Sequence, residues 1–554
     1  RRVMKKGQKR ILMILIFLLA AFLRFYQIGK NPVSLYWDEA AIALDAYSLS
    51  ETGKDMNNMS IWQPVFGSYG DFKAPVLIIL SSLSVRLFGM NAFALRLPIA
   101  IISLFSMLIV YFLVEELLSF DKDLKKKYQL LPLLTFFILA ISPWPVHFAR
   151  IAFESSLSVF FLLLSLWFFI KGIRGKNYWI ILSVIPGVLA PYSYYSLRVI
   201  VPLFVFFLII IFLKKMWPKK ILSLMLAIVL FIFATIPIIQ SPYYARSQDY
   251  RLNNNNLIHM QKVIEESSQY LERYQSNQVA KLVYHRYIFL GRDFLKNFLS
   301  HFSLDFLFIS GDLNLRQHSG YWGEFFPVLL PAYVLGLYLL AKNLKSKTSQ
   351  FLLVFLLLSP IPASMVYEVP HASRAIYLFV PFSIIIAWGL VEIFNCLSKI
   401  KNPVSKKLLS VAVIMIILLN AVFYYVDYFI DYPKRSSASW LYQYNQVAAY
   451  IKEHYQEYRT ITIDERYWFP RIFIYYQFPE LIIKLQELKN ALLNNPVNSF
   501  GLPDPFEYIL DGDPQKKEGQ FIYYENAVPE GFVEVKRFDF LDGKPSLKLV
   551  VKEP

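Results

Sequence analysis

Two neighbouring carboxylates open a polar segment in which acid–base chemistry is possible. Asp38 and Glu39 stand in the run Tyr-Trp-Asp-Glu-Ala-Ala of residues 36–41, directly after the first apolar stretch. A carboxylate within about 3 Å of a hydroxyl can accept its proton as the hydroxyl attacks another group. Carboxylates at a membrane surface are energetically expensive if their site is dry. The alternative is that Asp38 caps a helix running from Glu39 to Leu49, which is a common role for aspartate.

A second group with chemical potential lies in the run His-Phe-Ala-Arg-Ile-Ala-Phe-Glu-Ser-Ser of residues 147–156. The guanidinium of Arg150 matches the geometry of phosphate oxygens and can bind them through two nitrogens. Glu154 follows four residues later, so on a helix the two side chains would share a face and could pair with each other. Both interpretations, a phosphate or sugar contact and an internal ion pair, stay open.

Apolar stretches must position these residues. The 554 residues are 56% hydrophobic and 18% charged, and the mean hydropathy is +0.41. Soluble domains carry about 25% charged residues, so an ordinary soluble enzyme is excluded. Eleven stretches are long enough to approach the roughly 30 Å of a bilayer core, although tilt or merging would change that number. They lie at residues 11–26, 94–117, 129–145, 154–171, 177–191, 197–213, 221–239, 325–341, 350–367, 375–396 and 407–428.

The distribution of positive charge predicts the orientation of these stretches. The net charge is +17, and clusters of Lys and Arg precede the first stretch and follow the second, fourth, sixth, eighth and tenth. Cytoplasmic loops retain such clusters, so we expect a plasma-membrane protein with a cytoplasmic N-terminus and an extracytoplasmic C-terminus. The charge then reflects topology and contact with membrane lipids, and it gives no reason to expect a nucleic-acid partner. No small-residue cleavage site follows the first stretch, so we expect it to stay as an anchor.

Three polar segments fall outside the membrane in this topology. They are an outer loop at 27–93, a long outer loop at 240–324, and a tail at 429–554, with residues 1–428 forming the transmembrane domain. In the first loop, Val76–Phe88 is too short to span and is expected to lie in the interface. The tail is predicted to be a small α/β domain with a helix near 440–455, a strand at 459–464 and a hairpin-like pair around 532–551.

Three motifs in order carry a family resemblance. They are Asp-Glu-Ala-Ala at 38–41, Gly-Asp-Phe-Lys-Ala-Pro at 70–75, and Phe-Gly-Met-Asn-Ala-Phe-Ala-Leu-Arg-Leu-Pro at 88–98. As a combination they resemble the membrane glycosyltransferases of the GT-C fold, and within them the protein O-mannosyltransferases and the bacterial aminoarabinose transferases. The resemblance is strong over residues 25–205, recurs at 311–324 and 370–374, and is weak beyond 430. It implies a mainly α, polytopic membrane enzyme of the GT-C fold.

The resemblance implies roles for the first outer loop. Asp38 matches the proposed catalytic acid of the family, and Glu39 stands beside it as a second catalytic candidate. Lys73 matches a lysine that contacts the lipid phosphate, and Asp71 is expected to line the substrate cavity. The aminoarabinose enzymes have a metal-associated Glu directly before that lysine, where this chain has Phe72. No cofactor is therefore firmly implied, and a divalent metal is possible but unsupported.

Further candidates lie in later outer segments. Tyr192, Tyr194 and Arg198 match a family segment expected to line the cavity, with Arg198 as a second phosphate contact, although tyrosines also gather at bilayer interfaces. Asp312 and the pair His371 and Arg374 resemble segments near the donor site. Asp312 can equally be a turn residue, and His371 a satisfied interface histidine. The seven histidines show no metal-binding spacing, and Cys396 is the single cysteine, so neither a histidine nor a multi-thiolate metal site is expected.

The reaction that the resemblance implies is inverting sugar transfer from a polyprenyl-phosphate donor to an acceptor hydroxyl of a protein, lipid or glycan at the outer membrane face. Asp38 would take the proton, and Lys73, Arg150 and Arg198 would stabilise the leaving phosphate. The alternative is a lipid-linked substrate transporter or flippase without transferase activity. That class predicts repeated halves and ionisable residues near the bilayer midplane, and the sequence shows neither.

Overall fold

Helices make up most of the first of two units into which the chain divides. The computed structural model describes residues 6–68, 71–247, 260–275, 277–454, 461–464, 471–491, 506–509, 520–524 and 527–552. The first unit comprises Arg1–Tyr26 and Ile99–Tyr425, and the second comprises Gln27–Pro98 and Val426–Pro554.

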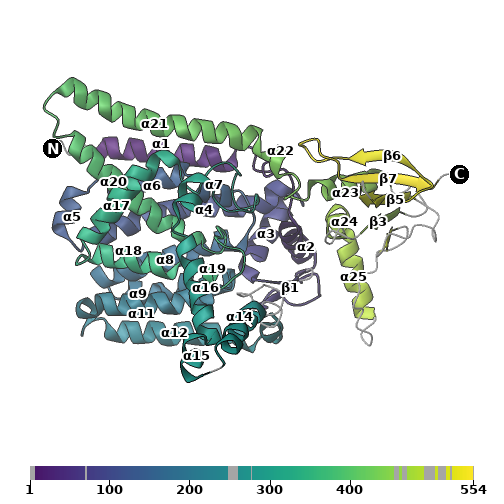
Figure 1. Ribbon diagram of the computed structural model, residues 1–554, viewed down its shortest axis with the longest axis horizontal. Coiled ribbons are helices and arrows are strands. Elements are labelled where there is room, and N and C mark those ends of the chain that lie inside the picture. Colours follow the sequence, from purple (N-terminus) through teal and green to yellow (C-terminus); the bar gives the residue numbers. More distant parts are fainter. Residues whose placement is uncertain are drawn as a thin grey trace. The chain divides into compact units, whose positions relative to one another are not determined.

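The first unit is almost entirely helical in its described residues (Figure 1). Its elements are α1 (Lys6–Phe25), α4 (Ala92–Leu118), which begins in the second unit, α5 (Lys122–Lys127), α6 (Leu131–Ile141), α7 (Pro143–Phe148), α8 (Glu154–Arg174), α9 (Tyr178–Leu182), α10 (Val184–Ser193), α11 (Leu197–Met216), α12 (Ile221–Gln240), α14 (Met260–Arg273), α15 (Gln278–Val283), α16 (Arg286–Ser300), η1 (Asp305–Ile309), η2 (Pro327–Leu329), α17 (Leu330–Lys342), α18 (Lys347–Leu358), α19 (Ile361–Ser364), η3 (Ile376–Leu378), α20 (Phe379–Leu397) and α21 (Pro403–Ile430), which ends in the second unit.

All of the apolar stretches predicted from the sequence lie on helices. Among the described residues, six helices are individually long and apolar enough to cross a membrane, and a bent pair, Pro327–Lys342 with Lys347–Ser364, makes up to seven if it counts as one span. Of the remaining stretches, the first lies on α1, which has 20 residues, and the other two form the pairs α6 with α7 and α9 with α10. The chain is therefore a multi-pass membrane protein, and the number of eleven crossings stays a prediction.

Glycines allow two helices of this unit to approach closely. A Cβ atom on Gly336 of α17 would lie 2.0 Å from the carbonyl oxygen of Ile385, and one on Gly389 of α20 would lie 1.8 Å from that of Ala332. Any side chain at either position would push the two backbones apart. Close backbone contact at small residues is a common way for helices to associate in membranes.

The second unit combines the first outer loop with the tail. The loop contains α2 (Trp37–Thr52), a hairpin of β1 (Phe66–Ser68) and β2 (Asp71–Lys73), and α3 (Pro75–Phe88). The tail contains α22 (Tyr432–Ser436), α23 (Tyr442–His454), β3 (Ile461–Asp464), α24 (Arg471–Gln477), α25 (Glu480–Ala491), β4 (Phe506–Ile509), β5 (Gln520–Tyr524), β6 (Phe532–Phe538) and β7 (Leu547–Lys552). A helix over Val76–Phe88 is thus confirmed, whereas its position in the interface stays a prediction.

The tail combines helices with a sheet, as the sequence predicted. Its strands form one sheet in the order β4-β3-β5-β7-β6, with β3 parallel to both its neighbours and β7 antiparallel to β5 and β6 (Figure 1). The predicted helix, strand and terminal hairpin are α23, β3 and the pair of β6 with β7. The predicted start of the strand, at residues 459 and 460, lies outside the described residues.

One apolar core joins the loop to the tail within this unit. Ala40, Ala41 and Leu44 of α2 pack in the same buried cluster as Val447 and Ile451 of α23. Residues of α24 and α25 join them, among them Ile472, Phe473 and Ile482. The helix that carries the first candidate carboxylates is therefore supported by a domain that lies almost four hundred residues later in the chain.

Candidate active site

Helix α2 begins two residues earlier than the sequence predicted. Tyr36 is its N-cap, with extended backbone angles of φ −84° and ψ 162°, and Trp37 is its first residue. The backbone N–H of Tyr36 donates to Oε2 of Glu39 at 3.4 Å, which is half of a capping box. Asp38 therefore does not cap the helix. The capping role that was the alternative for Asp38 is therefore absent, and Glu39 is the side chain that bonds to the backbone at the helix start.

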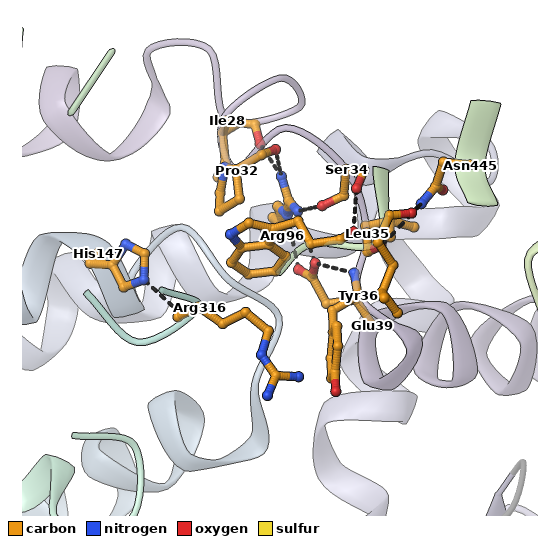
Figure 2. A network of polar contacts seen from close by, with 12 residues as sticks. Ile28, Pro32, Ser34, Leu35, Tyr36, Glu39, Arg96, His147, Arg316 and Asn445 are labelled. Atoms are coloured by element: carbon orange, nitrogen blue, oxygen red, sulfur yellow. Dashed lines mark hydrogen bonds and ion pairs between the residues drawn. The ribbon is translucent and has the colours of Figure 1, made fainter. Parts of the chain in front are cut away.

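Glu39 and Arg96 form a fully buried ion pair in the second unit (Figure 2). Nε of Arg96 donates to Oε1 of Glu39 at 2.9 Å, and one terminal nitrogen donates to Oε2 at 2.8 Å. The remaining guanidinium hydrogens meet the carbonyls of Ile28, Pro32 and Ser34 at 2.7 to 3.2 Å. All five donors of Arg96 are thus used. This geometry favours a structural role for Glu39 over the catalytic one predicted for it.

Asp38 contacts Lys73, the residue that the resemblance predicted to bind the lipid phosphate. Nζ of Lys73 forms an ion pair with Oδ1 of Asp38 and a second one, at 3.2 Å, with Oδ2 of Asp71. The indole Nε1 of Trp37 donates to the other oxygen of Asp38 at 3.2 Å. The Lys73 side chain is only 6% exposed, whereas that of Asp38 is 36% exposed. The structure thus brings together three of the predicted site residues. The Asp38 carboxylate is partly exposed, and the Lys73 ammonium is buried.

The hairpin explains how Lys73 reaches this place. Phe66 of β1 pairs with Lys73 of β2, and Ser68 pairs with Asp71. Side chains alternate along a strand, so Asp71 and Lys73, two residues apart, project on the same side. Both therefore face α2. Pro75 then begins α3, where its missing N–H costs nothing.

Arg150 and Glu154, in the first unit, do not share a helix. Arg150 lies in the break between α7 and α8, and Glu154 is the first residue of α8. The helical spacing that suggested their pairing is therefore absent. Arg150 is fully buried, and it donates to the backbone carbonyls of Leu23 at 2.8 Å and Arg24 at 3.2 Å. Glu154 is half-buried.

The tyrosine-rich segment ends α10 and leads into α11. The hydroxyl of Tyr192 donates to the carbonyl of Ala234 at 3.0 Å, and Tyr194 is half-buried. The guanidinium of Arg198 lies 4.1 Å from the ring centre of Tyr195 and 5.6 Å from that of Tyr244. Aromatic faces at these distances stabilise a cation. A cavity role for these residues stays a prediction.

The two late segments of the first unit meet each other. Asp312 accepts the backbone N–H of Asn314 at 2.8 Å, which is the turn geometry, and also that of Ala372 at 2.7 Å. Gln317 accepts the N–H of Ser373 at 2.8 Å. The predicted segments at 311–318 and 371–374 are therefore hydrogen-bonded to one another. Arg374 is half-buried beside them.

Burial shifts the pKa values of three side chains in and beside these two segments. It raises the pKa of Asp312 to about 6 and that of buried Glu324 well above its usual range. It also lowers the pKa of His371, whose backbone N–H donates to Nε2 of His301 at 3.2 Å. The His371 side chain is therefore neutral at pH 7, which argues against a simple cationic contact with phosphate. Sequence reasoning missed His301, Gln317 and Glu324, because single polar residues in a long loop give no periodic signal.

Sequence reasoning also missed residues around Asp38. Arg96 was noted only as part of a motif, and Asp45, which lies two helical turns after Asp38, was not singled out. The spacing of seven residues between the two aspartates could have revealed that they share a helix face. Within the described residues, no group of three or more His, Cys, Asp or Glu side chains is placed to hold a metal ion.

Comparisons with known proteins agree with the motifs. Residues 72–239 match the family model described as dolichyl-phosphate-mannose-protein mannosyltransferase. A protein of Bacillus subtilis (strain 168), named "Putative mannosyltransferase YkcB", is 29% identical over 259 residues, which are 44% of this chain and 33% of that protein. The chain thus spans about a third of this curated relative.

Solved structures extend the likeness to the whole chain. ArnT from Cupriavidus metallidurans in the apo state matches with a TM-score of 0.52 and 10% identity, over 98% of this chain and 97% of ArnT. The same protein bound to undecaprenyl phosphate matches with a TM-score of 0.50 and 9% identity, over 98% of each chain. The Archaeoglobus fulgidus oligosaccharyltransferase matches with a TM-score of 0.49 and 15% identity, over 86% of this chain and 63% of that chain. The family match and the ArnT fold confirm the predicted resemblance to GT-C glycosyltransferases.

Proposed function

We propose that this chain, which has the GT-C fold of membrane glycosyltransferases, transfers a sugar from a polyprenyl-phosphate donor to an acceptor hydroxyl at the outer face of the membrane. The transfer inverts the anomeric centre, and Asp38 is the base. The acceptor belongs to a protein, a lipid or a glycan. The description of the matching family and the undecaprenyl phosphate named with ArnT support the donor class.

The ion pair of Asp38 with Lys73 carries this proposal. A transferase that uses a phosphate-linked sugar needs a base for the hydroxyl and a cation for the departing phosphate. Asp38 supplies a partly exposed carboxylate oxygen, and Lys73 supplies a charged ammonium within one hydrogen-bonded group. Asp38 lies on helix α2, which packs in the buried core of the second unit, and Lys73 lies on strand β2, which pairs with β1. Both groups are therefore in position before substrate arrives.

The reaction then balances without another reactant. The acceptor oxygen attacks the anomeric carbon and forms the new glycosidic bond, while the bond from that carbon to the phosphate oxygen breaks. The phosphate leaves with the electron pair as polyprenyl phosphate, and the hydroxyl proton moves to Asp38. Phosphate is a good leaving group, so it needs charge stabilisation more than protonation. Lys73 can supply this while Asp71 continues to hold one side of the ammonium.

The roles predicted for Glu154, Tyr192, Tyr194 and Asp312 in the substrate cavity, and for Arg150, Arg198 and Arg374 on the donor phosphate, remain part of this proposal. A guanidinium binds phosphate through two nitrogens, so each of these three arginines is chemically suited to the role. For His371, burial argues for a neutral side chain, so we propose hydrogen bonding in place of charge.

The test is transfer of radiolabelled sugar from a panel of polyprenyl-phosphate sugars by the purified full-length chain in lipid. Asp38→Asn keeps the shape of the side chain and removes the base, so transfer should fall by about 100-fold or more. Glu51→Gln is the matched control, because Glu51 is an exposed carboxylate near the end of the same helix. Equal rates in wild type and Asp38→Asn would overturn Asp38 as the base. Donor binding without transfer from any donor would favour the lipid-linked transporter.

A further inference from the structure

We propose that Asp45 is a positioning residue, which fixes the hairpin that carries Lys73 against helix α2 and thereby sets where Lys73 meets Asp38. The functional consequence rests on the proposed function. The structural part stands on the contacts between α2 and the hairpin.

Helix α2 touches the hairpin at two points on one face. Asp38 and Asp45 are seven residues apart, so they lie two turns from each other on the same side of the helix. Asp38 pairs with Lys73 on β2. Asp45 accepts a hydrogen bond from the Oγ of Ser68 on β1, at 2.6 Å. Each strand of the hairpin is therefore bound to the helix by its own carboxylate.

Asp45 makes this contact in complete burial. Its side chain is 0% exposed, and its second oxygen accepts the backbone N–H of Met56 at 3.2 Å. Burial raises the pKa of Asp45 to about 7, against the opposing effects of Ser68, Met56 and Lys73. A buried carboxyl at this cost is retained more readily where it specifies geometry than where it only fills space. Both of its oxygens are used to fix neighbouring segments to α2.

The loop that follows α2 holds the same strand a second time. Asp55 accepts the backbone N–H groups of Asn57 at 2.9 Å and Met59 at 2.7 Å, which fixes the loop in a turn. The side-chain amide of Asn57 then donates to the carbonyl of Gly67, next to Ser68. Strand β1 is thus anchored at two consecutive residues, and Asp45 provides the anchor that comes from α2.

The hairpin needs such anchors because it is small. Each strand has three residues, and an isolated two-stranded hairpin is marginally stable in water. Without the contact of Asp45 with Ser68, the strands can shift while Asp38 stays in place on its helix. The ammonium would then leave its position, and the base would not. Donor binding and the departure of the phosphate should therefore both suffer, because Lys73 acts on the phosphate in both.

The experiment compares Asp45→Asn, Ser68→Ala and Ser68→Thr in the full-length chain in lipid. Ser50→Ala is the matched control, because the Ser50 hydroxyl donates to the Tyr47 carbonyl of the same helix, at 2.8 Å, and this bond stays within α2. Hydrogen–deuterium exchange of peptides covering residues 66–73 reports on the hairpin without requiring activity. Donor KM and kcat report on the site.

We expect faster exchange in the hairpin and an approximately tenfold lower kcat/KM for the donor in Asp45→Asn and Ser68→Ala, because Lys73 is then misplaced for both the bound and the departing phosphate. Ser68→Thr and Ser50→Ala should behave as wild type. The double variant Asp45→Asn/Ser68→Ala should be no worse than Asp45→Asn alone, because that single variant has already lost the contact with Ser68. Unchanged hairpin exchange in both single variants, or additive effects in the double variant, would overturn the proposal. Absence of transfer in wild type would refute the proposed function, while the exchange data would still decide the role of Asp45.

Discussion

Trp37 and Asp38 are adjacent in sequence and hydrogen-bonded in the structure, with the indole Nε1 at 3.2 Å from Oδ2 of the carboxylate. Lys73 holds the other oxygen of Asp38. The carboxylate is therefore fixed from two sides by groups with different origins, one on its own helix and one on the hairpin. A base fixed in this way has a defined direction towards an incoming hydroxyl.

Trp37→Phe tests this fixation. The substitution keeps an aromatic ring next to Tyr36, from which the indole ring centre lies 4.9 Å away, but removes the N–H donor. A hydrogen bond of about 1.4 kcal/mol corresponds to tenfold, so kcat should fall by roughly 3- to 10-fold. Steady-state transfer kinetics measure this. A kcat equal to that of wild type would show that Lys73 alone orients the carboxylate.

Glu39→Gln separates a structural from a catalytic role for Glu39. The change leaves Arg96 buried without a charged partner, and breaking such a pair costs about 3–5 kcal/mol. We expect a lower thermal unfolding midpoint and less folded protein. The transfer rate per folded molecule should stay within a few-fold of wild type. A rate per folded molecule reduced as far as in Asp38→Asn would instead assign Glu39 to the chemistry.

The buried carboxyl of Asp45 should make the free energy of unfolding depend on pH. Burial raises its pKa to about 7 in the folded chain, from an ordinary value of 3.8. The folded state therefore binds the proton more tightly than the unfolded state between these values. The stabilisation is complete below about pH 4 and is lost as the pH rises through 7. Two other charged groups also shift the pKa of Asp45. The negative charge of Asp55 raises it, and the positive charge of Lys73 lowers it.

Thermal unfolding at pH 5, 6, 7 and 8 checks this dependence. Asp45→Asn has no proton to lose, so its midpoint should lie furthest below that of wild type at pH 5, and the gap should narrow by pH 8. A gap that is the same at every pH would show that Asp45 keeps its charge in the folded chain.

Much of this architecture was predictable from local patterns. Apolar stretches gave the helices, because hydropathy and length are local properties, and alternating residues gave the terminal hairpin of β6 and β7. Contacts between distant segments were not predictable. Glu39 looked catalytic because its partner Arg96 lies 57 residues away. Asp38 looked like a cap because Tyr36, which takes that position, has no capping side chain by type. The joint core of α2 with α23 could not be inferred from either segment alone.

That joint core gives the tail a role that substitution can test. Ile451 of α23 is fully buried in the cluster that includes Leu44 of α2. Ile451→Ala removes buried methyl groups and should cost about 2–5 kcal/mol. Because α2 shares this core, hydrogen exchange should increase in peptides of α2 as well as in the tail, and transfer should fall with it. Val535→Ala is the control, because Val535 on β6 is 50% exposed. If Ile451→Ala loosens the tail while exchange in α2 and transfer stay unchanged, the tail is an independent module and its support of α2 is dispensable.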